Sequence, residues 1–282
     1  MTWHLTEDVE EFRTATETFL AADPARNTVL LTLTEGARAG VWPGARFGWW
    51  TPPDGAGAGE ADGAVGGAVG GAYIQTPGMP PVLGTMPDEA ARDLAGVLRG
   101  SDLVGVNGAT ATARAFGEAW GPYRVDREER LFRLAELAEP AAVVGRSRLA
   151  TEADLPLVTE WMTAFIDELG LPAELGAART ASRRTTAGQL VLWEGEQGPA
   201  SLAAASAVLA GQSRIGPVYT PPALRGRGYA AAATAAATRL ATGWGAAEVV
   251  LFTDLANPTS NALYQRLGYR QVQDHLVLDF TG

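Results

Sequence analysis

The two halves of this 282-residue chain carry the same order of expected elements. Each half opens with an amphipathic helix, HLTEDVEEFRTATETFLAADP in the first and RLATEADLPLVTEWMTAFIDELGLP in the second. Thr6 is a cap candidate for the first helix, and Thr151 with Asp154 forms a capping-box pattern before the second. This internal repeat is too long for a solenoid, whose repeats run to ~50 residues. It therefore predicts two similar α/β domains.

The later elements of the two halves also correspond. In the first half the expected strands are 45–50, 63–75, 102–108 and 128–137, with a helix at 110–120. In the second half they are 189–195, 200–208, 247–254 and 275–280, with a helix at 258–268. The Glu139-Pro140 pair interrupts any regular element between the halves. We therefore expect domains at 1–140 and 141–282.

Composition removes most catalytic strategies. The chain has no cysteine and two histidines, His4 and His275, and all 22 of its basic residues are arginine. Disulfides, thiol nucleophiles and lysine Schiff bases are thereby excluded, and a histidine metal site or a Ser-His-Asp triad has almost no material. We expect no metal, and we interpret His275 as an ordinary strand residue.

The charge of the chain argues against two classes of partner. The net charge is −10, of which residues 1–140 contribute −9 and residues 141–282 contribute −1. Because no basic block occurs, we expect neither nucleic-acid binding nor docking on an anionic membrane. No apolar run reaches the ~18 residues of a membrane span, and the acidic start lacks a signal-peptide pattern. These features predict a cytoplasmic protein.

One loop in the second half has the chemistry of a phosphate site. A strand at Arg214–Tyr219 ends at Thr220-Pro221-Pro222, where the prolines stop sheet pairing and open the strand edge. The run Arg225-Gly226-Arg227-Gly228-Tyr229-Ala230 follows and leads into an alanine-rich helix that extends to about Leu240. Unshielded amides at a helix N-terminus cradle phosphate, and the two arginines add mobile positive charge. A Gly-x-Gly entrance also fits a flexible helix start with no ligand.

A second motif follows in chain order. Asn257 precedes Pro258, and Tyr264 lies seven residues after Asn257 in NPTSNALYQRLGY. Asn257 fits a helix N-cap with proline at the first helical position. Tyr264, at helical spacing from Leu263 and Leu267, also fits a core tyrosine.

The two motifs in this order resemble those of the GCN5-related N-acetyltransferase (GNAT) superfamily, over about residues 149–280. The resemblance implies a mixed, mostly antiparallel α/β sheet flanked by helices, in two tandem GNAT-like domains. It implies acetyl-CoA as co-substrate, with the pyrophosphate on the loop amides and the pantetheine arm along the strand end and Asn257. It also implies that Tyr264 protonates the departing thiolate. The residues expected at the cofactor site are Val218, Tyr219, Thr220, Arg225, Gly226, Arg227, Gly228, Tyr229, Ala230 and Asn257.

Direct transfer from a thioester to an amine needs no enzyme nucleophile, which suits a chain without cysteine or lysine. The incoming ammonium must lose a proton, to a carboxylate or through water. Glu168 and Asp254 are the leading candidates for this base, with Asp167 as a third.

The first half lacks the corresponding motifs. Its loop reads LGTMPDEA at 83–90, without paired glycines, and Asp88 and Glu89 stand where phosphate would arrive. Gly117 or Phe116 falls opposite Tyr264, and neither donates a proton. We therefore expect a degenerate first domain that binds no acetyl-CoA.

The sequence favours an acetyl-CoA-dependent N-acetyltransferase of a small primary amine, acting as a monomer or homodimer. Two alternatives stay open. One is an acyltransferase with another acyl donor, and the other is a coenzyme A-binding sensor or scaffold without turnover. Tyr264 distinguishes an enzyme from a sensor or scaffold, because a sensor needs no phenol at that position.

Overall fold

The computed structural model describes residues 2–53, 68–171 and 176–281. Contacts between residues divide the chain into two compact units. The first comprises Met1–Leu131, Thr253–Ala256 and Val272–Gly282, and the second comprises Phe132–Phe252 and Asn257–Gln271. The end of the chain thus belongs to the first unit, although the division expected at 140/141 places it with the second half.

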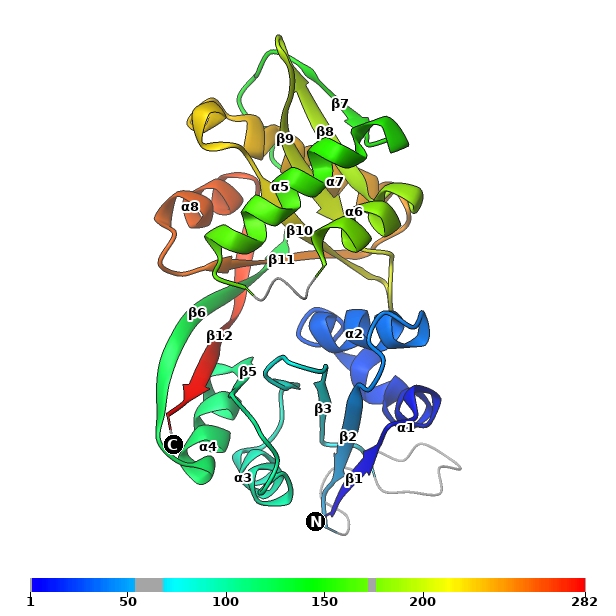
Figure 1. The fold of residues 1–282 in the computed structure, drawn as a ribbon, viewed down its shortest axis with the longest axis vertical. Coiled ribbons are helices and arrows are strands. Elements are labelled where there is room, and N and C mark those ends of the chain that lie inside the picture. Colours follow the sequence, from blue (N-terminus) through cyan, green and yellow to red (C-terminus); the bar gives the residue numbers. More distant parts are fainter. Residues whose placement is uncertain (1, 54–67, 172–175, 282) are drawn as a thin grey trace. The chain divides into compact units, whose positions relative to one another are not determined.

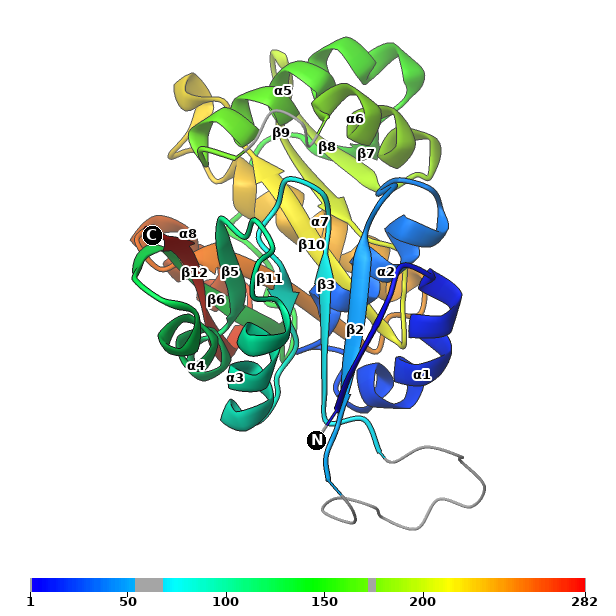
Figure 2. The ribbon, with the colours of Figure 1, turned by 60° about the horizontal axis from the view of Figure 1, so that its bottom comes forward.

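The first unit combines strands with four helices among its described residues (Figures 1 and 2). Its elements are β1 Thr2–Thr6, α1 Val9–Ala22, α2 Thr28–Arg38, β2 Arg46–Thr51, β3 Gly71–Gln75, β4 Val82–Leu83, α3 Asp88–Val97, β5 Gly105–Ala109 and α4 Thr110–Trp120. It also takes most of β6, Tyr123–Leu134, and the end of β12, Tyr269–Phe280. The strand order is β1-β2-β3-β4-β5-β12, and only β4 and β5 pair in parallel among the ladders described for this unit.

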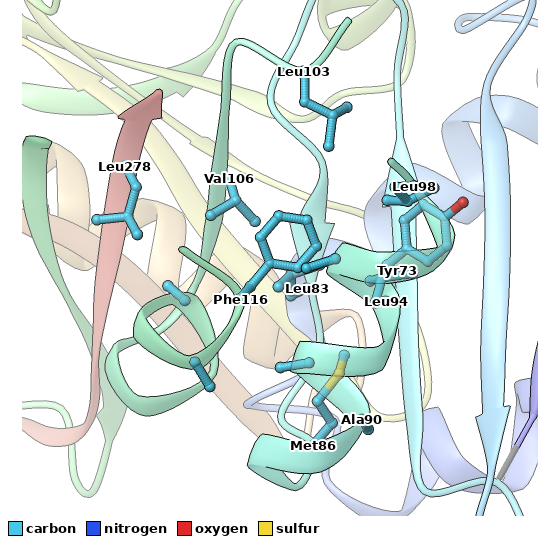
Figure 3. Close-up of a cluster of buried hydrophobic side chains, with 14 of the residues drawn as sticks. Tyr73, Leu83, Met86, Ala90, Leu94, Leu98, Leu103, Val106, Phe116 and Leu278 are labelled. Carbon is cyan, nitrogen blue, oxygen red and sulfur yellow. The ribbon is translucent and has the colours of Figure 1, made fainter. Parts of the chain in front are cut away.

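Strand β12 completes the core of the first unit. Residues His275–Asp279 pair antiparallel with Ala109–Gly105 of β5. Leu276 and Leu278 are buried in a cluster with residues of α3, α4 and β5. Figure 3 shows Leu278 beside Val106 and Phe116 in this cluster. The apolar alternation of the final strand is therefore satisfied by the first unit.

The second unit has the other set of elements. They are β7 Arg146–Leu149, a 3-10 turn Glu152–Asp154, α5 Leu155–Glu168, α6 Ala177–Thr186, β8 Leu190–Gly195, β9 Gly198–Ala205, β10 Gln212–Tyr219, a 3-10 turn Pro222–Leu224, α7 Tyr229–Gly243, β11 Glu248–Asp254 and α8 Pro258–Arg266. The strand order is β6-β11-β10-β9-β8-β7. Pairing is antiparallel from β7 to β10 and parallel between β10 and β11.

Helices cover both faces of the second sheet. Figure 1 shows α5 and α6 side by side over β8, β9 and β10. Trp161 and Met162 of α5 and Ala181 of α6 pack in one cluster with Leu192 and Leu202. Side chains that alternate with these along the strands pack in a second cluster with residues of α7 and α8. The predicted mixed, mostly antiparallel α/β fold is confirmed.

Local sequence signals define several helix starts. The expected capping box is present, because the Asp154 Oδ2 accepts from the Thr151 amide at 2.8 Å and the Thr151 side chain accepts from the backbone in return. The cap proposed for the first helix was wrong. Asp8 caps α1 by accepting from the Glu10 and Glu11 amides, whereas Thr6 ends β1 and accepts from the Asp8 amide. The expected strand at 63–75 forms from Gly71, while residues 63–67 lie outside the described residues.

Candidate functional site

Strands β10 and β11 separate part-way along their length. Within the described chain, their parallel pairing runs from Gln212 opposite Glu248 to Ile215 opposite Leu251 and extends no further. The β9 ladder also shifts its register between Ile215 and Val218. Pro217 lies in this interval, and a proline has no amide hydrogen to donate to a sheet.

The opening therefore begins earlier than the sequence analysis expected. The sequence predicts that pairing stops at Thr220-Pro221-Pro222, but the parallel ladder ends five residues before Thr220, just ahead of Gly216-Pro217. The proline inside the strand was the signal that the sequence analysis missed. The main chain at Val218 and Tyr219 pairs with Ala203 and Leu202 of β9, so β10 continues beyond the opening with one neighbour.

The end of β10 is held by a buried serine. The Ser201 hydroxyl donates to the Tyr219 carbonyl at 2.9 Å and lies 2.9 Å from the Thr220 hydroxyl oxygen. Ser201 is fully buried, and Tyr219 and Thr220 are nearly so. The Tyr219 ring packs against Trp161 of α5 at a centroid distance of 6.2 Å. These contacts hold the segment Val218–Thr220 in a defined position beside the opening.

The glycine loop enters α7 without a side-chain cap. Gly226 and Gly228 have φ of +76° and +83°, the left-handed region that glycine adopts without strain. Gly228 is the N-cap residue, and the first turn of α7 has neither a capping side chain nor an acidic residue. The first intrahelical bond is from the Ala232 amide to the Gly228 carbonyl, at 3.1 Å. The amides of Tyr229, Ala230 and Ala231 precede it and carry the positive end of the helix dipole.

Packing also requires a glycine at position 228. A Cβ at this position would lie 2.8 Å from the Val143 Cγ2 atom, whereas a Cβ at Gly226 would meet no atom within 4 Å. Gly228 is thus required by packing and by backbone conformation, and Gly226 leaves open space beside the loop.

Arg225 is engaged rather than mobile. Its Nη2 donates to both carboxylate oxygens of Glu168, at 2.6 and 2.7 Å, and its Nε donates to the Thr220 carbonyl at 2.9 Å. The guanidinium carbon lies 5.9 Å from the centroid of the Tyr219 ring. The sequence predicts mobile positive charge at both Arg225 and Arg227. Among the described residues, Arg225 is ion-paired, whereas Arg227 is exposed and its guanidinium donates only to the Ala223 carbonyl, at 3.3 Å.

Burial and charge both act on Tyr219. Burial raises the pKa of its phenol, and the negative charge of Glu168 raises it further. The phenol therefore stays protonated at neutral pH. Tyr219, Arg225 and Glu168 form one polar group at the end of α5 and β10.

Asn257 and Tyr264 lie at the start and in the second turn of α8. The Asn257 Oδ1 accepts from the Ser260 amide at 3.0 Å, so the predicted N-cap before Pro258 is confirmed. Because Oδ1 serves the cap, the exposed amide nitrogen is the polar atom that remains for a ligand. This cap does not compete with a binding role.

Tyr264 is buried in the cluster beneath α7 and α8, 8% exposed. Its ring meets Tyr269 edge-on at 6.2 Å. Burial raises the pKa of Tyr264 to about 12. The two tyrosines differ at their hydroxyls, because that of Tyr269 lies 2.7 Å from the Thr238 hydroxyl oxygen, whereas that of Tyr264 has no hydrogen-bond partner among the described residues.

The two leading base candidates belong to different units. Glu168 ends α5 in the second unit and is bound by Arg225. Asp254 ends β11, accepts from the Ala256 amide at 2.7 Å and belongs to the first unit. Asp167 is exposed beside Glu168. Among the described residues, no group of three or more acidic or histidine side chains is placed to hold a metal ion.

The first unit has a different helix start at the corresponding place. Helix α3 follows Pro87, has Asp88 and Glu89 in its first turn, and carries an Arg92–Asp88 ion pair of 3.5 Å. In α4, Phe116 and Gly117 are buried. A Cβ on Gly117 would lie 2.9 Å from the Leu278 Cδ1 atom, so this position has no room for a side chain.

Residues 156–269 match the model of the acetyltransferase (GNAT) family, so this part of the chain is a GNAT domain. The predicted resemblance is confirmed. No curated protein matches the sequence.

Solved structures of similar fold extend over the whole chain. A Drosophila protein has a TM-score of 0.66 at 12% identity, covering 99% of this chain and 98% of its own. An acetyltransferase of the GNAT family from Colwellia psychrerythraea has a TM-score of 0.61 at 12% identity and covers 100% of both chains. A GCN5-related N-acetyltransferase from Sphaerobacter thermophilus has a TM-score of 0.60 at 14% identity, covering 98% of this chain and 94% of its own. The full-length matches agree with two GNAT-like domains in one chain.

No helix within the described residues is long and apolar enough to cross a bilayer.

Proposed function

We propose that this protein transfers an acetyl group from acetyl-CoA to the primary amine of a small molecule. Residues 141–282 supply the catalytic domain, and residues 1–140 form a GNAT-like domain that does not bind the cofactor. The open strand edge after Ile215, next to a helix with free N-terminal amides, is the observation that carries the proposal.

The loop before α7 fits a pyrophosphate. The amides of Tyr229, Ala230 and Ala231 have no intrahelical acceptor, and the space beside Gly226 is open. Arg227 is exposed at the same loop. Helix α3 of the first unit has acids in the equivalent turn, which repel a phosphate. This contrast supports cofactor binding by the second domain alone.

The strand end fits a pantetheine arm and its thioester. Pairing with β11 has stopped before Val218, and Ser201 holds the Tyr219 carbonyl. A main-chain amide in this segment would donate to the thioester carbonyl oxygen and stabilise the negative charge that develops there. Asn257, through its amide nitrogen, would bind the arm from α8.

Tyr264 would act as the general acid. The amine nitrogen forms a bond to the carbonyl carbon, the carbon–sulfur bond breaks, and the phenol gives its proton to the sulfur. With a pKa of about 12 the phenol holds its proton at neutral pH, and a hydroxyl without a described protein partner can be oriented by the substrate. The amine's own proton would pass to Glu168 or Asp254, directly or through water.

Coenzyme A release on a panel of primary amines tests the proposal. We expect the Tyr264→Phe variant to lose about 10²-fold or more in kcat, because it removes the proton donor, and to keep its affinity for acetyl-CoA. Tyr269→Phe is the matched control, since its ring centroid lies 6.2 Å from that of Tyr264 and its hydroxyl is hydrogen-bonded to the Thr238 hydroxyl. That variant should keep kcat and lose about 1 kcal/mol of unfolding free energy.

Other results would point elsewhere. Acetyl-CoA binding in calorimetry with no amine-dependent release identifies a sensor or scaffold. Release only from a longer acyl-CoA identifies another acyl donor. Equal rates for wild type and Tyr264→Phe rule out the phenol as the acid.

A further inference from the structure

Three arginines gather on the face of the second sheet that α5 and α6 cover. Arg183 and Arg184 end α6, and Arg214 lies in β10. Ile215 packs in the cluster with α7, so its neighbour Arg214 projects to the opposite face of the sheet. The positive charges of Arg214 and Arg183 both act on the Arg184 guanidinium.

Arg184 has buried donors without a described acceptor. Its Nε and Nη1 atoms are buried and have no hydrogen-bond partner among the described residues. The adjacent Thr185 hydroxyl is also buried without a described partner. Burial and the two neighbouring arginines lower the pKa of Arg184 to about 9. A buried cation among like charges is costly unless an anion joins it, so these donors lack a counterpart.

Arg214 lies on the same strand as the proposed thioester site, close to the opening between β10 and β11. Arg214 lies opposite Val250, one residue before the last paired position, Ile215. A strand rises about 3.3 Å per residue, so the Arg214 Cα is on the order of 13 Å from the Val218 Cα. An extended acceptor with its amine and its anionic group at opposite ends would bridge a separation of this order.

We propose that the amine acceptor carries an anionic group, a carboxylate or a phosphate, and that Arg184 binds that group beside the positive charge of Arg214 while the amine reaches the opening between β10 and β11. This inference rests on the proposed function and specifies its substrate class. The Nε and Nη1 atoms of Arg184 have no described acceptor, so their N–H groups are available to donate to the oxygens of such a group.

Matched amines test the site. The probes are ω-amino carboxylates of three to eight carbons against alkylamines of equal length, and ω-aminoalkyl phosphates against the amino alcohols. We expect kcat/KM to be at least tenfold higher for one anionic series than for its neutral counterpart, and the better series distinguishes carboxylate from phosphate. The Arg184→Gln variant should bring the ratio close to one, while Arg184→Lys should keep part of it.

Arg179→Gln is the control, because it removes an exposed arginine from the same helix. It should leave the ratio unchanged. Without ligand, Arg184→Gln should keep or raise the unfolding temperature, since the buried charge is uncompensated, whereas an arginine that holds the fold would give a lower temperature. A lower temperature, or an anionic preference that survives Arg184→Gln, overturns the proposal.

These experiments distinguish failure of the proposed anion site from failure of the proposed acetyltransferase function. If neutral amines are acetylated as well as anionic ones, the function stands and the anion site does not. If no amine is acetylated, the rise in unfolding temperature with millimolar 6-aminohexanoate or 6-aminohexyl phosphate decides the site. A rise confined to proteins with Arg184 supports it, and an equal rise in Arg184→Gln or no rise in wild type overturns it.

Discussion

The Arg225 guanidinium binds both carboxylate oxygens of Glu168, at 2.6 and 2.7 Å. The residues come from the phosphate-type loop and from the end of α5, and their side chains are 48% and 44% exposed. An exposed ion pair contributes about 0.2–1 kcal/mol, so a ligand that competes for either partner separates them at small cost. Two groups with separate expected roles, a phosphate contact and a base, are therefore coupled.

Replacement of Glu168 by glutamine should change the unfolding free energy by less than about 1 kcal/mol, because the pair is exposed. If Glu168 accepts the amine's proton, kcat should fall about 10²-fold. The measurement is coenzyme A release at saturating acetyl-CoA beside urea unfolding. Asp254→Asn is the parallel variant. A loss of kcat only in Asp254→Asn assigns the base to Asp254 and leaves Glu168 as the residue that positions Arg225.

The two loop glycines should differ in tolerance. Alanine at Gly226 should cost about 1–2 kcal/mol for the left-handed conformation alone. Gly228→Ala should cost more, because its Cβ would lie 2.8 Å from Val143. Urea unfolding of Gly228→Ala in the wild-type and Val143→Ala backgrounds should show coupling that Gly226→Ala lacks. Additive effects for Gly228→Ala would contradict the contact.

His275 should make stability depend on pH. It is buried in β12, and burial lowers its pKa from 6.5 to about 4. Between these pH values the unfolded chain binds a proton that the folded chain does not, so stability falls as pH is lowered through this window. The loss amounts to at most roughly 3 kcal/mol. Thermal unfolding from pH 7 to 4 should show a shallower dependence of stability on pH for His275→Gln than for the wild type.

The final strand should stabilise the first unit strongly. Leu278→Ala should cost about 2–5 kcal/mol, because the side chain is fully buried beside Val106 and Phe116. Asp279→Asn removes the exposed ion pair with Arg124 and should cost less than about 1 kcal/mol. Hydrogen exchange should show the loss of protection in β5. An effect of Leu278→Ala confined to the second unit would contradict the assignment of this strand.

Local pattern was sufficient for the elements themselves. Apolar periodicity and capping chemistry act over a few residues, so the Thr151 box, the Asn257 cap and strands such as Leu190–Gly195 were predictable. The Thr6 cap failed by two residues, because Thr6 belongs to a strand that pairs with Phe47. Pairing with a distant strand overrode a local preference.

By itself, the sequence determined the α/β repeat, the order of the two motifs and the side chains available for chemistry. Tertiary structure alone decided that β10 pairs in parallel with β11, that Arg225 meets Glu168 across 57 positions, and that Arg184 lies near Arg214. It also placed the end of the chain in the first unit. The physical reason is common to all four: each depends on contacts between segments far apart in sequence, and local periodicity carries no information about which strand, charge or ring will lie opposite.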